Sequence, residues 1–559
     1  MATATLLSTA GIAAGPAGAA GAAGAALQAG ADAPLLTLTS QTPWVSPTQP
    51  WFDLSLAVGD GGVPASDLNV SLTFYSRIAY TSQFDQALGA VPQKGVLLRV
   101  PDVPVAETGQ GRLAVACVTV LPEASASAPA AGSGACPAAS PTLDLGCTPN
   151  TGECGDVYPV SVALLRQGAS APVARFTTFV TYQEPQGPEK NYPPLRVGLM
   201  APVAGAGATT MATTLSAHRD VPVTLVVSPR TVATLVAGHS KEGDHALTQL
   251  ADLSGDEVTA QPYVPVNVAA LSETGIAGEI QAQLARGTQL LREAGLRPVG
   301  SAWVDTTSSY SEGDAAYLAS GLQVAGADHL VLNDADLASA GSTNLTFAQP
   351  FTLDLGRGNG PATAASDSTL SALFTTTPAN PVLGAEQLLA GLSFVHFEDA
   401  FKPDPRGVVV APPANWRASG DFMDVLLAGL SQNPALMPVT LTELFGQVSA
   451  GGNGEPSTRR LQAGPAGHSI TRAAGQKIAV GRQQLTSWCC GANAAVTAQP
   501  AGLTALGDLL LSTESQRLNA AGRSAALTVY DRAFAAETGT ITLATERTVT
   551  FTSQRAAVP

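Results

Sequence analysis

Charged side chains are scarce in this chain of 559 residues. Only 13% of the residues are Asp, Glu, Lys or Arg, and 43 acidic residues against 28 basic ones give a formal net charge of −15. Nucleic-acid-binding proteins present a basic face to phosphates, so this balance excludes a nucleic-acid partner from our interpretation. Aromatic residues are also few, at 5%, whereas hydrophobic residues reach 45%. The chain can therefore fill hydrophobic cores, and its length has room for three or four domains of roughly 150 residues.

Long apolar runs are missing as well. The sequence has no stretch of about 18 strongly apolar residues, so it shows no membrane span. Residues 1–31 carry no charge and are mostly Ala and Gly. A secretory signal normally begins with Lys or Arg. We interpret residues 1–33 as a signal peptide whose start is lost, with a disordered low-complexity segment as the alternative.

The usual catalytic motifs are also lacking. No G-x-S-x-G elbow follows a predicted strand, and no Gly-rich phosphate loop with a Lys is present. The six histidines are scattered, and His239 and His245 lie six residues apart, which is not the i, i+4 spacing that places two imidazoles on one helix face. We therefore predict neither a metal site nor a cofactor.

Four of the six cysteines fall close together, and they are Cys117, Cys136, Cys147 and Cys154. An even-numbered cluster in a Pro/Ser-rich loop is typical of disulfides formed in an oxidising compartment. Among the three possible pairings we predict Cys117–Cys154 and Cys136–Cys147. A four-thiolate zinc site is the alternative, but its usual paired C-x-x-C spacing is missing. Cys489 and Cys490 are predicted to lie in a helix as small apolar residues.

Residues 194–445 alternate between strand and helix patterns. The clearest unit is the β-branched run at 223–227, after which Ser228 is predicted to cap a helix whose first residue is Pro229. Further strands are predicted at 195–200, 257–263, 301–305, 329–333 and 407–413, with a Ser311-capped helix and a Ser419-capped helix among those between them. Alternation of this kind predicts a parallel sheet covered by helices, and this many units favours a β/α barrel.

The flanking segments have other patterns. Residues 34–185 predict an immunoglobulin-like β-sandwich with about seven strands, near 35–40, 51–58, 70–75, 96–100, 113–118, 158–164 and 174–182. After the barrel we predict a linker at 446–475 and a helical segment at 476–538. The alternating runs within 539–559 predict the first strands of a truncated β domain. The overall fold class is therefore multidomain α/β plus all-β.

Candidate site residues are those that follow the barrel strands. Asp305 and Asp334 end two successive strands and form a candidate acid pair for glycoside hydrolysis, which needs two carboxylates about 5 to 10 Å apart. The alternative is that both cap helices or turns. Aromatic and amide residues at strand ends or beside them could form a flat ligand-binding surface, the aromatic floor, and they are Tyr263, Trp303, Asn415 and Trp416. The alternative is that these side chains pack in the core or in loops. We place Glu398 and Asp399 on a solvated helix face.

In the order of its segments the sequence resembles a family of large exported actinobacterial envelope proteins classed as a domain of unknown function. The resemblance covers roughly residues 34–559, and the segments that carry it lie at 155–162, 194–202, 225–232, 261–267, 406–416, 438–445 and 550–553. It implies a central barrel similar to the glycoside hydrolase/deacetylase type, an extracytoplasmic location, and a further β domain and membrane anchor beyond this chain. Deacetylases of this type have a metal-binding Asp after the first strand. Here that strand ends Met200-Ala-Pro-Val, without a carboxylate.

These observations predict an exported cell-envelope protein whose degenerate barrel binds wall glycan or a protein partner without catalysis. The alternative is a carbohydrate-active hydrolase that acts on cell-wall polysaccharide with Asp305 and a second acid. A decayed gene product is a third option.

Overall fold

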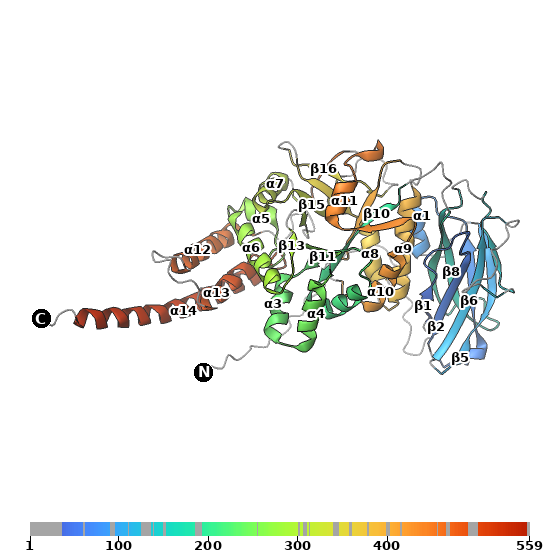
Figure 1. The fold of residues 1–559 in the computed structure, drawn as a ribbon, viewed down its shortest axis with the longest axis horizontal. Helices are drawn as coiled ribbons and strands as arrows, with labels where there is room; N and C mark the ends of the chain where they lie inside the picture. Colours follow the sequence, from blue (N-terminus) through green and yellow to red (C-terminus); the bar gives the residue numbers. More distant parts are fainter. Residues whose placement is uncertain are drawn as a thin grey trace.

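A computed structural model describes residues 36–555, with side chains up to Glu537. It leaves out residues 60–61, 90–94, 110, 124–135, 138, 149–152, 185–192, 254, 300–301, 306–309, 312, 339–345, 357–359, 377–378, 399–402, 414–415, 455–456, 465–469 and 490–500. The predicted signal segment at 1–33, together with Asp399, Asn415 and Cys490, lies outside the described residues. The described chain is a mixed α/β protein in which a β lobe, a central β/α lobe and a set of C-terminal helices follow one another (Figure 1).

The β lobe consists of two facing sheets. Its strands are β1 Leu36–Gln41, β2 Trp51–Val58, β3 Leu68–Tyr75, β4 Val96–Pro104, β5 Ala106–Thr108, β6 Gly111–Leu121, β7 Thr142–Asp144, β8 Asp156–Arg166 and β9 Ala174–Tyr182. One sheet has the order β1-β2-β6-β5 with β7 beside β6, and the other has the order β4-β3-β8-β9. Alternate residues of β2 and β3 are buried, as expected for strands with one face on a core. Both sheets contribute to that core, where Phe52 and Phe74 meet edge to face at 6.1 Å.

The central lobe alternates strands and helices. Its strands are β10 Leu195–Val203, β11 Thr224–Val227, β12 Glu257–Thr259, β13 Pro298–Val299, β14 Ala302–Val304, β15 His329–Asn333, β16 Phe351–Asp354, β17 Ala362–Ser366, β18 Gly407–Val410 and β19 Leu436–Val439. Its helices are α2 Ala208–Ala217, α3 Pro229–Gly238, α4 Lys241–Ala251, α5 Val268–Glu273, α6 Gly278–Glu293, α7 Asp314–Ala325, α8 Ser368–Thr376, α9 Pro381–Glu398, α10 Gly420–Leu430 and α11 Leu441–Gln447.

The parallel strands of this lobe curve into a barrel, in which no pairing of β13 with β14 is seen among the described residues. The path β13-β12-β11-β10-β18-β17-β15-β14 is parallel at every step. Its two ends, β13 and β14, are consecutive in the chain, because β13 ends at Val299 and β14 begins at Ala302. Alternate strand residues, such as Met200, Val331 and Val409, form an inner core, and α11 packs against it. The first turn of α11 is fixed there, since Leu441 N–H donates to Thr224 Oγ1 at 2.9 Å.

Several helix starts follow the predicted capping rules. Ser228 Oγ accepts the Thr231 N–H at 3.4 Å with Pro229 as the first residue of α3, and Ser419 caps α10. The predicted Ser311 cap is wrong. Helix α7 begins three residues later, and Ser311 N–H instead donates to Asp314 Oδ2 at 2.6 Å. The carboxylate of the first helical residue therefore reaches back to the preceding loop.

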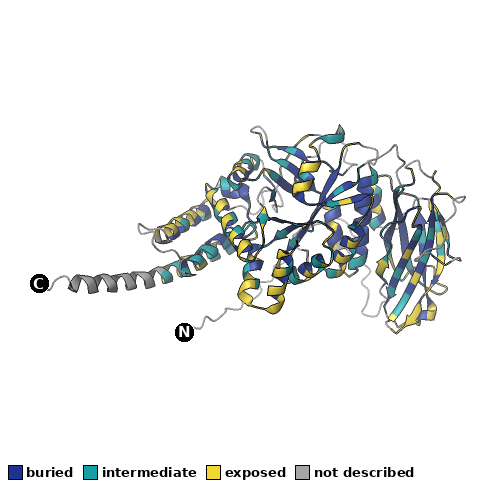
Figure 2. Ribbon diagram, viewed as in Figure 1, coloured by how far each residue is buried: buried dark blue, intermediate teal, exposed yellow. Residues whose placement is uncertain are grey.

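Helix α9 is buried between the two lobes, as its dark blue colour in Figure 2 shows. Residues 383–396 of α9 are all buried, and α9 packs on β1, β8 and β9. The expected solvated face is therefore wrong for Glu398, whose oxygens accept hydrogen bonds from Thr81 Oγ1 and Thr346 N–H, each at 3.2 Å. The sequence did not predict α1 (Thr81–Gly89), whose Phe84 stacks on Phe179 and on Phe394 of α9.

The C-terminal segment differs from prediction in two places. The predicted linker includes β20 (Thr458–Arg460), which pairs in parallel with β16, and so is part of the central lobe. The predicted helical segment contains three helices, which are α12 Arg472–Cys489, α13 Ala501–Ser512 and α14 Ala520–Arg555. Helix α14 continues through residues 539–555, where we expected two strands. Extending an existing helix adds a hydrogen bond per residue, whereas an isolated hairpin is marginal, which is the physical reason for the difference.

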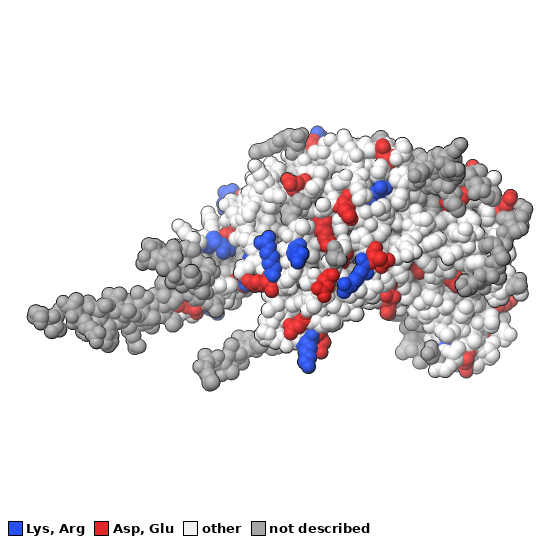
Figure 3. All heavy atoms as spheres, viewed as in Figure 1, with Lys and Arg blue, Asp and Glu red and all other residues white. Residues whose placement is uncertain are grey.

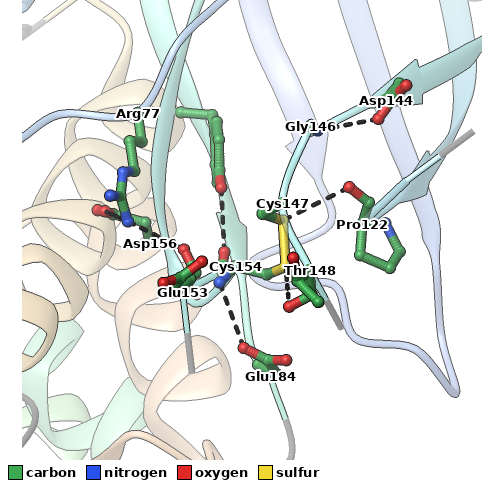
Figure 4. The surroundings of a disulfide bond; sticks show 11 residues. Arg77, Pro122, Asp144, Gly146, Cys147, Thr148, Glu153, Cys154, Asp156 and Glu184 are labelled. Carbon is green, nitrogen blue, oxygen red and sulfur yellow. Dashed lines mark hydrogen bonds and ion pairs between the residues drawn. A yellow bond between two sulfur atoms is a disulfide. The ribbon is translucent and has the colours of Figure 1, made fainter. Parts of the chain in front are cut away.

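The disulfide pairing that we predicted is wrong. The structure joins Cys117 to Cys136 and Cys147 to Cys154, with Cα–Cα distances of 5.5 and 5.4 Å. Because β7 runs parallel to the end of β6, the chain that leads into β7 returns alongside Cys117 and brings Cys136 to it. The second disulfide closes the turn before β8 and lies near Glu184, which accepts the Cys154 N–H at 3.2 Å (Figure 4).

Candidate functional site

Three neighbouring barrel strands each end in an aspartate. Asp305 follows β14, Asp334 follows β15 and Asp367 follows β17. Asn333 of β15 lies opposite Ser366 of β17, so the next residue of each strand leaves the sheet at the same level. Asp305 N–H donates to the Val331 carbonyl oxygen at 2.8 Å, which fixes it beside β15. We call Asp305, Asp334 and Asp367 the aspartate row; it lies at the C-terminal edge, where β/α barrels hold their active groups.

Two members of the aspartate row hold the start of α8. Asp367 is 8% exposed, and its Oδ1 accepts the Leu370 N–H at 2.7 Å, which is the geometry of a helix N-cap. Burial raises the pKa of Asp334, and hydrogen bonds from Ser368, the first residue of α8, partly offset that effect. The structure therefore places Asp334 and Asp367 in the capping role that the sequence offered as the alternative for Asp334.

Two further carboxyl groups act on this row. Asp336 is 7% exposed, and burial, followed by the negative charge of Asp334, raises its pKa to about 6. The pKa of Asp367 is also raised to about 6, first by burial and then by the charges of Asp334 and Asp85. Because Asp85 belongs to α1, the β lobe contributes a carboxyl group to the electrostatics of the barrel edge.

Sequence reasoning missed Asp367, Asp336 and Asp85 as members of this cluster. Strand β17 is Ala-Thr-Ala-Ala-Ser, which lacks the β-branched run that marks the other strands, so the residue that follows it was not recognised as a strand end. The Asp367-Ser-Thr-Leu pattern was the available signal, since Asp is a preferred N-cap. Asp85 had no signal, because only the tertiary fold brings α1 to the barrel.

Carboxyl groups with raised pKa values can hold a proton near neutral pH and act as general acids. A shared metal ion is a different use of such groups. Among the described residues, the set of ligand atoms close enough to share an ion is that of Asp53, Cys117 and Cys136. Both cysteines are in a disulfide and offer no thiolate, so this set does not fit a metal site.

The predicted aromatic floor is not brought together. Trp416 packs edge to face against Phe374 and Phe422, with ring centroids 5.3 and 6.1 Å apart, in the core that α8, α9 and α10 share. Tyr263 and Trp303, at 9% and 5% exposure, lie in a separate core with α5, α7 and the C-terminal helices. Of the three predicted contact residues that the structure describes, Trp416 is the one that stays half-buried at the barrel edge.

Two cavities lie in the helical layer. One of about 690 Å³ lies between α6 and the end of α7, over Ala302 and Trp303. The other, of about 570 Å³, lies between the start of α6 and α12. On the face in Figure 3, Lys and Arg are interspersed with Asp and Glu, with broad uncharged areas between them. A ligand of that face would meet mostly uncharged surface.

Comparisons with known proteins give weak likenesses. No protein-family model matches the chain, and a search of curated proteins found no match. Among solved structures, a 4-alpha-glucanotransferase from Thermococcus litoralis has a TM-score of 0.38 at 13% identity over 53% of this chain, which spans about half (47%) of that enzyme. A putative polysaccharide deacetylase from Mycobacterium smegmatis has a TM-score of 0.34 at 14% identity, covering 49% of this chain and 96% of that one. A CE4 family pseudoenzyme from Bacillus anthracis has a TM-score of 0.26 at 14% identity, covering 48% and 70%. We take no function from these likenesses.

Proposed function

We propose that this chain is a noncatalytic protein of the cell envelope whose barrel edge binds a wall glycan. The observation that carries the proposal is the use of the aspartate row. Asp367 caps α8 and Asp334 is held by the same turn, so two of the three carboxylates of the row, one of them from the candidate acid pair, are engaged in supporting the helix. A barrel edge maintained in this way is suited to binding rather than to bond cleavage.

Trp416 supplies the aromatic part of this proposed surface. It follows the C-terminal end of β18, and its edge-to-face contacts with Phe374 and Phe422 fix the ring. A fixed, half-buried indole offers an apolar face to sugar C–H groups at little entropic cost. Charged residues make up only 13% of the chain, which suits a neutral glycan as the ligand.

The envelope location rests on the cysteines. Both disulfides of the β lobe are of the kind that persists in oxidising compartments. Among the described residues, no helix has both the length and the apolar character that a membrane crossing requires.

A carbohydrate-active hydrolase is the second candidate, and one observation favours it. Burial raises the pKa of Asp334, a member of the candidate acid pair, and a raised pKa is what a general acid needs. In that case Asp305 and Asp334 are the proposed acid pair at the ends of adjacent strands.

The test is sedimentation of the full chain with purified insoluble peptidoglycan and with arabinogalactan, with assay of the supernatant for reducing ends and acetate. We expect binding without release, and we expect Trp416→Ala to weaken binding by about fivefold, since a well-placed aromatic contact contributes about 1 kcal/mol. Tyr80→Ala is the matched control, because Tyr80 is an aromatic 54% exposed on the β lobe. Release that Asp305→Asn or Asp334→Asn abolishes would establish the hydrolase instead. If the chain neither binds these polymers nor releases products from them, both candidate functions are excluded. Attention then turns to an envelope protein as the partner.

A further inference from the structure

The C-terminal helices dock on α6 of the barrel through a buried polar network. Glu279 of α6 is 6% exposed, and Arg482 of α12 binds both of its carboxylate oxygens, with Nε at 3.1 and 3.0 Å and Nη2 at 2.6 Å from Oε2. Gln283, one turn further along α6, donates to Glu514 Oε2 and to the Leu511 carbonyl oxygen, each at 2.8 Å. Glu514 is fully buried in the turn after α13. We call α12, α13, this turn and residues 520–537 of α14 the C-terminal unit.

No positively charged side chain among the described residues is bound directly to the Glu514 carboxyl group. The groups that face it are Glu279 and Gln283 from α6, Arg482 from α12, and Arg523 from α14. Arg482 is bound to Glu279 and also lies near Tyr530, whose hydroxyl donates to the Gly481 carbonyl oxygen. The Arg523 guanidinium donates to main-chain carbonyl oxygens, which are those of Thr513, Ser515 and Leu518. Glu514 therefore has an acidic neighbour in contact and no bound guanidinium among the described residues.

One oxygen of the Glu514 carboxyl group has no hydrogen-bond donor among the described residues. Oε1 is buried and receives no N–H or O–H from any residue that the structure describes, while the Glu279 carboxylate lies against the Glu514 carboxyl. Two ionised carboxylates in contact in a buried site repel each other and lack hydration. A proton on Glu514 removes the repulsion and supplies the donor for a hydrogen bond to Glu279. Burial first, and then the charge of Glu279, raises the pKa of Glu514 well above its ordinary value.

We propose that the C-terminal unit is a pH-sensitive latch, held on α6 by protonated Glu514 donating to Glu279 and released when that proton leaves to solvent. In the released unit Glu514 faces water and titrates as an ordinary glutamic acid. Docking is thus strongest below the ordinary pKa of a glutamic acid and weakens as the pH rises toward the raised value. Between these limits the docking constant falls by up to about tenfold per pH unit, because one proton is lost on release.

Release also has a consequence for the barrel. Tyr263 lies in the core that α13 shares with α5 and α6, and burial, followed by the negative charge of Asp508, raises its pKa. Undocking exposes this ring, one of the residues that the sequence marked as a ligand contact. The latch itself does not depend on the proposed glycan binding.

The test is hydrogen–deuterium exchange of the full chain at pH 6, 7, 8 and 9, corrected for the intrinsic exchange rate at each pH. Amides of α13 should lose protection by up to about tenfold per pH unit in the wild type, while amides of α2 serve as the internal reference. Glu514→Gln keeps both hydrogen bonds without a titratable group, so its α13 protection should not change with pH. Asp508→Asn is the matched control, since Asp508 pairs with Arg286 at 2.6 and 2.7 Å across the same interface. It should lower protection equally at every pH and keep the wild-type slope.

Wild-type protection that is independent of pH, or an unchanged slope in Glu514→Gln, would overturn the latch. If Glu514→Gln does not fold, infrared spectra of the wild type decide between the outcomes. A protonated-carboxyl band that decreases as α13 protection falls supports the proposal, and loss of protection without any change in that band contradicts it.

Discussion

The side-chain amide of Gln387 in α9 donates a hydrogen bond to the carbonyl oxygen of Thr177 in β9, 2.7 Å away. The preceding residue, Glu386, accepts one from Gln41 Nε2 of β1 at 3.4 Å. Both α9 side chains are 3% exposed, and the core beneath them contains Val157 and Phe179 of the β lobe together with barrel residues. The β lobe and the barrel therefore share one interface and are expected to unfold together.

This interface predicts a pH dependence of stability. Burial raises the pKa of Glu386 to about 8 from 4.5, so the unfolded chain releases this proton first as the pH rises. The contribution of Glu386 is fully present below about pH 4.5 and is lost as the pH rises toward about 8. In that window Glu386 makes the unfolding free energy of the wild type fall by up to roughly 1.4 kcal/mol per pH unit. Glu386→Gln removes this contribution, so the unfolding free energy of the variant should fall less steeply with pH. Urea unfolding at a series of pH values measures this slope. Glu123→Gln, at an exposed position, is the control, and equal slopes in wild type and Glu386→Gln would contradict the prediction.

The disulfides give a second prediction. Non-reducing peptide mapping should recover Cys117 linked to Cys136 and Cys147 linked to Cys154. Replacing the second pair by alanine should cost about 2–3 kcal/mol, because the bond closes a short loop in the unfolded chain. Thermal unfolding of the full chain under oxidising conditions measures that loss. A peptide that links Cys117 to Cys154 would show that the chain adopts another pairing.

Much of the strand inventory followed from sequence, for a physical reason. Residues 51–58 and 174–182 alternate or run β-branched between turn residues, and the structure has β2 and β9 at those bounds. The buried run at 329–333 is likewise β15. Local pattern was enough there because each strand is marked by its own residues.

Other features depend on partners that lie far apart in sequence. Strand β20 is only Thr458–Arg460, and it forms because β16 offers it a free edge. The disulfide pairing depends on β7 lying parallel to β6, which no cysteine spacing reveals. The candidate site was half predictable for the same reason. Asp305 and Asp334 follow recognisable strands, whereas Asp85 reaches Asp367 only through the packing of α1.

The last prediction concerns two glycines of α6. A Cβ on Gly287 would overlap the carbonyl oxygen of Gln261, a backbone atom, whereas a Cβ on Gly278 would meet nothing within 4 Å. Helix α6 thus packs directly on the chain that leaves β12, and only glycine permits that approach. Gly287→Ala should lower the unfolding free energy by about 2–3 kcal/mol, because main chain rather than a side-chain rotamer has to move. Gly278→Ala, the matched control in the same helix, should be neutral or stabilise the chain by at most about 1 kcal/mol. Urea unfolding midpoints of the two variants measure the difference. Equal midpoints would mean that α6 does not lie against Gln261 as closely as the structure places it.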